Sequence, residues 1–150
     1  MNKSFQQLVV LIVEDHFAMR KIIRTVLHSI GIRHIVEAGD GSQALSELKA
    51  RNQGLISDIA GGVGTARSID LIIADWNMPN VTGIELLKQV RAHHNWSSVP
   101  FMMLTAENSR EQIMEALNAG VSDYIVKPFT STLFEAKVRS LIEAKLGVTS

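Results

Sequence analysis

The sequence contains no cysteine, only three prolines and only 5% aromatic residues. The absence of cysteine excludes disulfide bonds and thiolate metal sites. Neither sign of charge is in excess, because 15 Lys and Arg residues balance 15 Asp and Glu residues, so no net charge attracts nucleic acid or an anionic membrane. The apolar run at residues 8–13 is too short for a signal peptide or a membrane span. We therefore expect a cytoplasmic protein with no nucleic-acid partner and no membrane insertion.

Apolar residues make up 46% of the 150 residues, which suits a single domain (1–150) with one core. Five short apolar segments predict buried strands at residues 8–13, 34–38, 69–75, 99–105 and 123–127. Apolar residues at helical spacing predict helices at 19–30, from 41 onward, at 83–93, from 109 to about 120 and from 132 onward. This alternation predicts an α/β fold in which five helices flank a doubly wound, five-stranded parallel sheet.

Three of these helices carry a capping-box pattern, in which Ser or Thr is followed three positions later by Glu or Gln. The pairs are Thr82 with Glu85, Ser109 with Gln112, and Thr132 with Glu135. We expect each pair to begin its helix.

Residues 51–68, between the second helix and the third strand, interrupt the regular alternation. Connections of this kind usually take about 2–6 residues. The glycines at 61, 62 and 64 argue against regular structure there. The apolar residues Leu55, Ile56 and Ile59 would suit a longer second helix. The insertion is therefore either a helix extension or a flexible loop.

Functional side chains lie at the carboxyl ends of four of the predicted strands. Glu14 and Asp15 come directly after the first, whereas Asp75, Thr105 and Lys127 stand at the carboxyl ends of the third, fourth and fifth. The carboxyl ends of parallel strands share one edge of a sheet, and ligands bind there. Carboxylates that lie close together need a cation, and oxygen ligands suit Mg²⁺. A lysine and a hydroxyl opposite them would hold phosphoryl oxygens. The pattern predicts Mg²⁺-assisted phosphoryl transfer with Asp75 as the nucleophile.

Four motifs give the chain a family resemblance. They are Val-Glu-Asp at 13–15, Asp-Trp-Asn-Met-Pro-Asn at 75–80, Thr-Ala-Glu at 105–107 and Tyr-Ile-Val-Lys-Pro-Phe at 124–129. Together, from residue 9 to about 147, they resemble the receiver domain of two-component response regulators, in particular the single-domain regulators of chemotaxis. The resemblance implies a flavodoxin-like sheet with strand order 2-1-3-4-5.

The resemblance assigns a magnesium site to four residues. Asp15 and Asp75 match the family's direct Mg²⁺ ligands, and Glu14 matches an acid that acts mainly through water. Asn77 matches the residue that lends its backbone carbonyl to the metal.

The resemblance also assigns the residues that handle the phosphoryl group. Asp75 matches the phosphorylated aspartate, Lys127 the phosphate-binding lysine and Thr105 the hydroxyl that moves to the phosphoryl group. Tyr124 matches the aromatic switch residue. The Lys127-Pro128 bond matches the family's cis peptide. Such a domain is not a conventional enzyme, but it catalyses its own aspartyl phosphorylation and dephosphorylation.

A histidine kinase is the implied phosphoryl donor. The implied output is altered binding of a downstream protein, a motor switch or a phosphotransfer protein, at a face containing Arg110, Ile113, Tyr124 and Lys137. One alternative is a phosphorelay intermediate that exchanges phosphate with a histidine phosphotransfer protein. A phosphatase resembling haloacid dehalogenases is disfavoured, because its Asp-x-Asp motif would stand where the chain has Glu14-Asp15-His16.

Other polar groups give no functional pattern. The histidines at 16, 28, 34, 93 and 94 lack a common metal-ligand spacing. The glycines at 61–64 lack the Lys-Ser/Thr ending of a phosphate loop, so no nucleotide site is predicted there. Trp76 is expected to pack beside the site without a chemical role.

Overall fold

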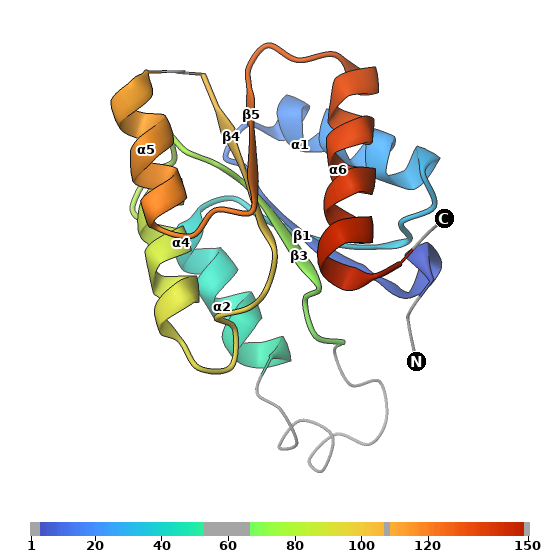
Figure 1. Ribbon diagram of the computed structural model, residues 1–150. Helices are drawn as coiled ribbons and strands as arrows, with labels where there is room; N and C mark the ends of the chain where they lie inside the picture. The colour runs from blue at the N-terminus through green and yellow to red at the C-terminus, as the bar shows by residue number, and fades with distance from the viewer. Residues whose placement is uncertain (1–3, 53–66, 107–108, 149–150) are drawn as a thin grey trace.

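The computed structural model of the chain describes residues 4–52, 67–106 and 109–148. Its strands are β1 (Val9–Val13), β2 (His34–Ala38), β3 (Leu71–Asp75), β4 (Phe101–Thr105) and β5 (Asp123–Val126). They form one parallel sheet in the order β2-β1-β3-β4-β5 (Figure 1), so the predicted fold and strand order are confirmed.

The described helices cover both faces of this sheet. They are the short 3₁₀ helix η1 (Phe5–Gln7), α1 (Phe17–Ser29), α2 (Gly41–Arg51), α4 (Gly83–Ala92), α5 (Arg110–Asn118) and α6 (Ser131–Leu146). Helices α1 and α6 pack on one face, and α2, α4 and α5 pack on the other (Figure 1). Among the described residues, no helix combines the length and the apolar character needed to cross a membrane.

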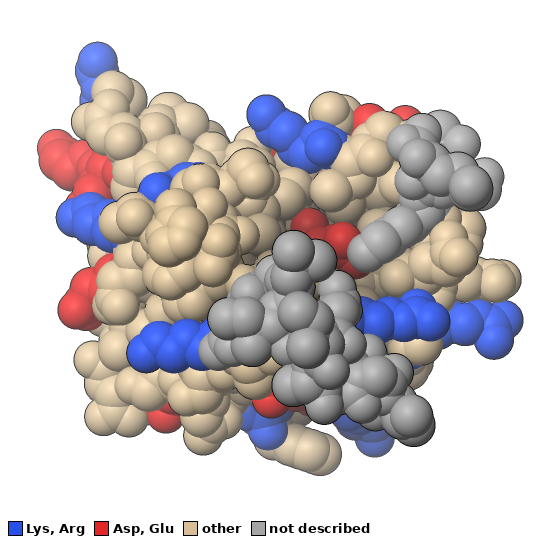
Figure 2. Space-filling view, turned by 90° about the horizontal axis from the view of Figure 1, so that it is seen from below, with Lys and Arg blue, Asp and Glu red and all other residues tan. Residues whose placement is uncertain are grey.

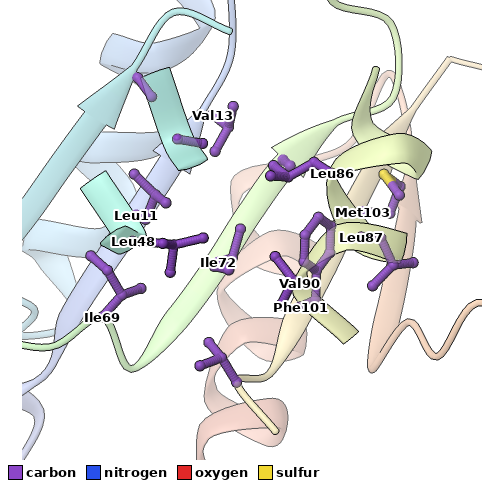
Figure 3. Packing of buried hydrophobic residues seen from close by; sticks show 14 of the residues in the cluster. Leu11, Val13, Leu48, Ile69, Ile72, Leu86, Leu87, Val90, Phe101 and Met103 are labelled. Atoms are coloured by element: carbon purple, nitrogen blue, oxygen red, sulfur yellow. The ribbon is translucent and has the colours of Figure 1, made fainter. Parts of the chain in front are cut away.

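Side chains of the central strands alternate between the two faces, as the pleat of a strand requires. In β1, Leu11 and Val13 contact the α2 and α4 side, whereas Val10 and Ile12 contact the α1 and α6 side. Figure 3 shows the first of these layers, in which the strand residues Ile72, Phe101 and Met103 meet the α4 residues Leu86, Leu87 and Val90. Because both faces are covered, every residue of β1, β3 and β4 is buried, as their continuous apolar runs predict.

The carboxyl ends of the strands lie at one edge of the sheet, and backbone hydrogen bonds continue past three of them. The N–H groups of Glu14, Trp76 and Lys127 donate to the carbonyl oxygens of Ala38, Leu104 and Thr105 at 3.1, 2.8 and 2.7 Å. The residues that follow β1, β3 and β5 are therefore fixed to the neighbouring strands.

The helix starts confirm one predicted capping box and correct two. At α4, Thr82 and Glu85 form the complete box. At α5, the Ser109 side chain accepts from the Gln112 N–H, but the reciprocal half is missing in the described chain, where Gln112 Oε1 has no hydrogen-bond partner. At α6, the cap is Thr130 and not Thr132, because its hydroxyl accepts from the Leu133 N–H at 3.0 Å. The Ser/Thr-rich run 130–132 offers three possible caps, and the wrong one was predicted.

The predicted insertion at 51–68 is described only at its two ends. Residues 53–66, with Leu55, Ile56 and Ile59, lie outside the described residues, so the choice between a loop and a helix extension stays open. The ends are joined by the buried Asn52 side chain, whose Oδ1 accepts from the Ile69 N–H at 2.8 Å and whose Nδ2 donates to the Ile69 carbonyl at 3.2 Å.

Two further bonds join these ends: Arg51 Nη1 donates to the Arg67 carbonyl at 3.2 Å, and Ser68 Oγ donates to the Arg51 carbonyl at 3.1 Å. Helix α2 ends and β3 begins at the lower edge of the sheet in Figure 1, opposite the edge where β4 ends. Figure 2 views the molecule from this lower side, where Lys and Arg side chains are spread around the outline with Asp and Glu between them.

Candidate functional site

Three of the predicted site residues form a charged cluster at the carboxyl edge of the sheet. Lys127 Nζ lies 3.3 Å from Glu14 Oε2 and 3.2 Å from Asp75 Oδ2. Glu14 is fully buried, and Asp75 is only 4% exposed. The Lys127-Pro128 peptide bond is cis, as the resemblance implied. The last residue of β3 and the residues directly after β1 and β5, far apart in the sequence, therefore meet around one point.

Burial governs the electrostatics of Asp75. Loss of water around its carboxyl group, followed by repulsion from the Glu14 carboxylate, raises the pKa of Asp75 above its ordinary value. The ammonium group of Lys127 opposes this rise through its charge and its hydrogen bond. Two buried carboxylates thus share one lysine, which leaves the cluster short of positive charge.

His16 belongs to the same cluster, although no role was predicted for it. Its Nδ1 lies 2.9 Å from Glu14 Oε1 and 3.2 Å from Asp15 Oδ1. The hydrogen bond to Glu14 is the main cause of a raised pKa of His16, and the charges of Asp15 and Glu14 add to it. The five histidines share no metal-ligand spacing, so the only sequence signal for this role is the position of His16 directly after Glu14 and Asp15.

The four side chains fit a divalent cation. Glu14, Asp15, His16 and Asp75 each offer one ligand atom, and these atoms all lie within 4.8 Å of one another. Three of the four donors are carboxylate oxygens, which are the ligands that Mg²⁺ and other hard cations prefer. The shortage of positive charge around Asp75 supports the same conclusion.

Thr105 and Tyr124 line a small cavity beside this cluster. It has a volume of about 10 Å³, room for about one water molecule, and is also lined by Trp76, Met103, Gln112, Ile113 and Ala116. Thr105 is buried and Tyr124 is half-buried. The two predicted switch residues therefore border the same small cavity.

The remaining predicted residues take different positions. Asn77 is exposed just beyond β3, and Arg110 is exposed at the start of α5. Lys137 Nζ binds Asp123 Oδ1 at 3.2 Å and lies 5.8 Å from the centre of the Tyr124 ring. Ile113 lines the same cavity as Tyr124, which Lys137 approaches, so these three residues share one side of the molecule. Glu107, the last residue of the third motif, lies outside the described residues.

Two further residues support the site and were not predicted to do so. Gly83, the first residue of α4, leaves no room for a side chain, because an added Cβ would collide with the carbonyl oxygen of Asp75 and with Trp76. Arg20 of α1 donates from Nη1 to the carbonyl of Glu14 at 2.8 Å. The missing side chain of Gly83 allows α4 to approach the end of β3 closely, and the hydrogen bond from Arg20 holds the backbone of Glu14 in place.

Sequence comparisons agree with this arrangement. The response regulator receiver domain family matches residues 10–139. The chemotaxis protein CheY of Pseudomonas aeruginosa is 40% identical over 138 residues, which cover 92% of this chain and 98% of that protein. The chemotaxis protein CheY-3 of Vibrio cholerae is 38% identical over 143 residues, which cover 95% of each chain.

Solved structures give the same result. The chemotaxis response regulator CheY4 of Vibrio cholerae superposes with a TM-score of 0.73 at 28% identity, over 89% of this chain and 98% of that one. The receiver domain of a sensor histidine kinase from Pseudomonas aeruginosa superposes with a TM-score of 0.71 at 26% identity, over 93% of this chain and 98% of that one. That receiver domain was solved with a magnesium ion coordinated in its active-site cleft.

Proposed function

Since this chain belongs to the family of response regulator receiver domains, we propose that it accepts a phosphoryl group on Asp75 from a histidine kinase and then changes its affinity for a target protein. Its similarity to CheY proteins of two bacteria supports a role in chemotaxis, with a motor switch protein as the target. The cytoplasmic location expected from the sequence is part of this proposal.

The position of Asp75 carries the proposal. Its carboxylate ends the central strand, is buried, and lies 3.2 Å from Lys127 and next to Glu14. A carboxylate held this way has few rotamers to lose when it attacks, because its strand and its neighbours already fix it. The bond-making step joins a carboxylate oxygen of Asp75 to phosphorus, while the bond from phosphorus to the kinase histidine breaks and the imidazole leaves.

Other residues of the chain would stabilise the transferred group. Lys127 Nζ, already between Glu14 and Asp75, would donate to a phosphoryl oxygen. The Thr105 hydroxyl at the end of β4 would donate to another. Because Thr105 and Tyr124 line the same cavity, a shift of Thr105 toward the phosphoryl group would leave space for the Tyr124 ring. The side of the molecule bearing Arg110, Ile113 and Lys137 would change with it.

Magnesium is the proposed cofactor. Glu14, Asp15 and Asp75 would hold it, with the backbone carbonyl of Asn77 as a further ligand. When bound, the ion supplies positive charge that neutralises the carboxylates and the phosphoryl oxygens during transfer.

A phosphorelay intermediate that returns phosphate to a histidine phosphotransfer protein is not favoured. It would use the same Asp75, Lys127 and Thr105, so the site geometry does not separate the two functions. The relatives at 38–40% identity are chemotaxis proteins, which favours a receiver that changes its affinity for a target protein over a phosphorelay intermediate.

Labelling with acetyl phosphate and Mg²⁺, followed by mapping of the adduct by mass spectrometry, tests the assignment of Asp75. We expect one phosphorylated aspartate in the wild-type protein and none in Asp75→Asn. The matched control is Asp70→Asn, which changes the residue immediately before β3, at its opposite end, and should label at the wild-type rate. Labelling of Asp75→Asn at the wild-type rate would refute the proposal.

A further inference from the structure

His16 occupies a position in α1 where its residue type is unfavourable. It is the N-cap of the helix, a position that favours Ser, Thr, Asp and Asn because their oxygens accept hydrogen bonds from the first turn. Within the described chain, the His16 side chain makes no capping hydrogen bond. Its ring is directed instead to the carboxylates of Glu14 and Asp15. Helix stability therefore gives no reason for a histidine here, whereas the cluster does.

We propose that His16 is a nitrogen ligand of the metal site, and that it gives the site a higher affinity for late first-row divalent ions such as Zn²⁺ than its carboxylates alone would provide. This inference rests on the proposed function only in placing a cation among the same acids. It changes the donor set from oxygen alone to a mixture of nitrogen and oxygen.

The distances match those of a shared ion. Neighbouring ligands of an octahedral ion with bonds of about 2.1 Å lie about 3 Å apart, and opposite ligands about 4.2 Å apart. His16 Nδ1 lies 2.9 Å from Glu14 Oε1 and 3.2 Å from Asp15 Oδ1, as neighbouring ligands do. Because all four ligand atoms lie within 4.8 Å of one another, only a small contraction would bring the most distant pair to the opposite-ligand distance.

The ring is also accessible from solvent, so an ion can reach it without unfolding of its surroundings. The His16 side chain is 73% exposed, while Glu14 below it is fully buried. Imidazole is a good ligand for Zn²⁺, Ni²⁺ and Cu²⁺ but a poor one for Mg²⁺, which prefers oxygen. A contribution from His16 should therefore appear with Zn²⁺ and be nearly absent with Mg²⁺.

Calorimetric titration of the metal-free full chain with Zn²⁺ and, separately, with Mg²⁺ tests this inference. We expect His16→Phe and His16→Asn to weaken Zn²⁺ binding at least tenfold, while the dissociation constant for Mg²⁺ changes less than twofold. His16→Asn supplies a favourable N-cap residue, so it remains informative if the phenylalanine variant folds poorly. The matched control is His28→Phe, an exposed histidine in the last turn of the same helix, which should change neither constant.

A second measurement reports on the ring nitrogen itself. In protein labelled with ¹⁵N-histidine, the Nδ1 resonance of His16 is identified as the one that is absent from the spectrum of His16→Asn. Zn²⁺ should shift this resonance. The inference would be overturned if the His16 variants lost affinity equally for Zn²⁺ and Mg²⁺, if they lost affinity for neither ion, or if Zn²⁺ left the Nδ1 resonance unshifted. These outcomes are separate from failure of the proposed function, which would appear as absent Asp75 labelling in the wild-type protein with Mg²⁺.

Discussion

Asp75 is a buried charge that costs stability in the metal-free protein. It shares Lys127 with Glu14, and burial is the main cause of its raised pKa. Since its pKa is higher in the folded than in the unfolded protein, ionised Asp75 lowers the free energy of unfolding at neutral pH. This loss of stability disappears as the pH falls below the pKa that Asp75 has in the unfolded protein.

Asp75→Asn is therefore expected to raise the free energy of unfolding of the metal-free protein at pH 7, by about 1 kcal/mol. Asparagine keeps the shape of the side chain and removes its charge. Urea unfolding in EDTA measures the change, and excess Mg²⁺ should reverse the order, because only the wild-type site binds the ion well. A less stable Asp75→Asn protein in EDTA would mean that the ion pair with Lys127 outweighs the cost of burial.

At the scale of single residues, positions set by the ends of strands could be predicted from the sequence, whereas positions set by local geometry could not. Glu14, Asp75 and Lys127 each follow an apolar run, so the parallel sheet alone brings them together. The role of His16 depends on which way one ring turns at a helix start. That of Gly83 depends on how closely α4 approaches β3. Neither is visible in the pattern of apolar residues.

At the scale of elements, the start of α4 combines backbone geometry with charge. The hydroxyl and the N–H of Thr82 both donate to Glu85 Oε1, at 2.9 and 3.2 Å, and Glu85 N–H donates back to the hydroxyl. The hydrogen bond from the Thr82 hydroxyl is the main cause of a lowered pKa of Glu85, and the hydrogen bond from the Thr82 N–H adds to it. Since α4 packs Gly83 against Asp75, its start also positions the end of β3.

The capping box predicts a pH dependence. Because the folded pKa of Glu85 is lowered, its contribution to stability is present above the unfolded pKa and is lost as the pH falls through the folded pKa. Glu85→Gln should therefore lower the urea midpoint more at pH 7 than at pH 4. Carboxyl NMR titration should find the Glu85 pKa below its ordinary value in the wild-type protein and closer to that value in Thr82→Val. An ordinary Glu85 pKa in both proteins would contradict the role of Thr82.

Element boundaries were less predictable than element types. Each predicted strand was found, but β3 and β4 begin two residues later than predicted, at Leu71 and Phe101. Apolar residues before them, such as Ile69 and Val99, are buried outside the ladder, so their hydrophobicity extends the pattern beyond the strand. The cap of α6 was misplaced for a similar reason, because Thr130, Ser131 and Thr132 are all acceptable caps and only the backbone decides between them.

At the scale of the whole molecule, the sheet separates the site from the insertion. Asp75 lies at the carboxyl end of β3, and the insertion enters at the amino end of the same strand. The alternation of strands and helices was sufficient to predict this separation. It was not sufficient to predict the buried Asn52, which joins the two ends of the insertion through a pair of hydrogen bonds to Ile69.

These bonds make residues 53–66 a candidate for removal. Replacing them with a short Gly-Ser turn should leave the free energy of unfolding within about 1 kcal/mol of the wild-type value, because halving a loop changes its closure cost by only about 0.6 kcal/mol. The rate of Asp75 labelling by acetyl phosphate should be unchanged. Asn52→Ala in the full chain is the contrasting variant, since it leaves the buried Ile69 backbone groups without their partner. It should lose about 1–3 kcal/mol, as expected for unsatisfied buried polar groups.

Urea unfolding of both variants, with acetyl phosphate labelling of each, separates the two possible roles of the insertion. A stable shortened protein beside a destabilised Asn52→Ala protein would mean that the hydrogen-bonded ends, and not the residues between them, belong to the fold. The insertion would then be available for a partner without affecting the chemistry at Asp75. A loss of several kcal/mol on shortening, or failure of the shortened protein to label, would instead mean that residues 53–66 contribute to the core, and that the helix-extension alternative deserves preference over the loop.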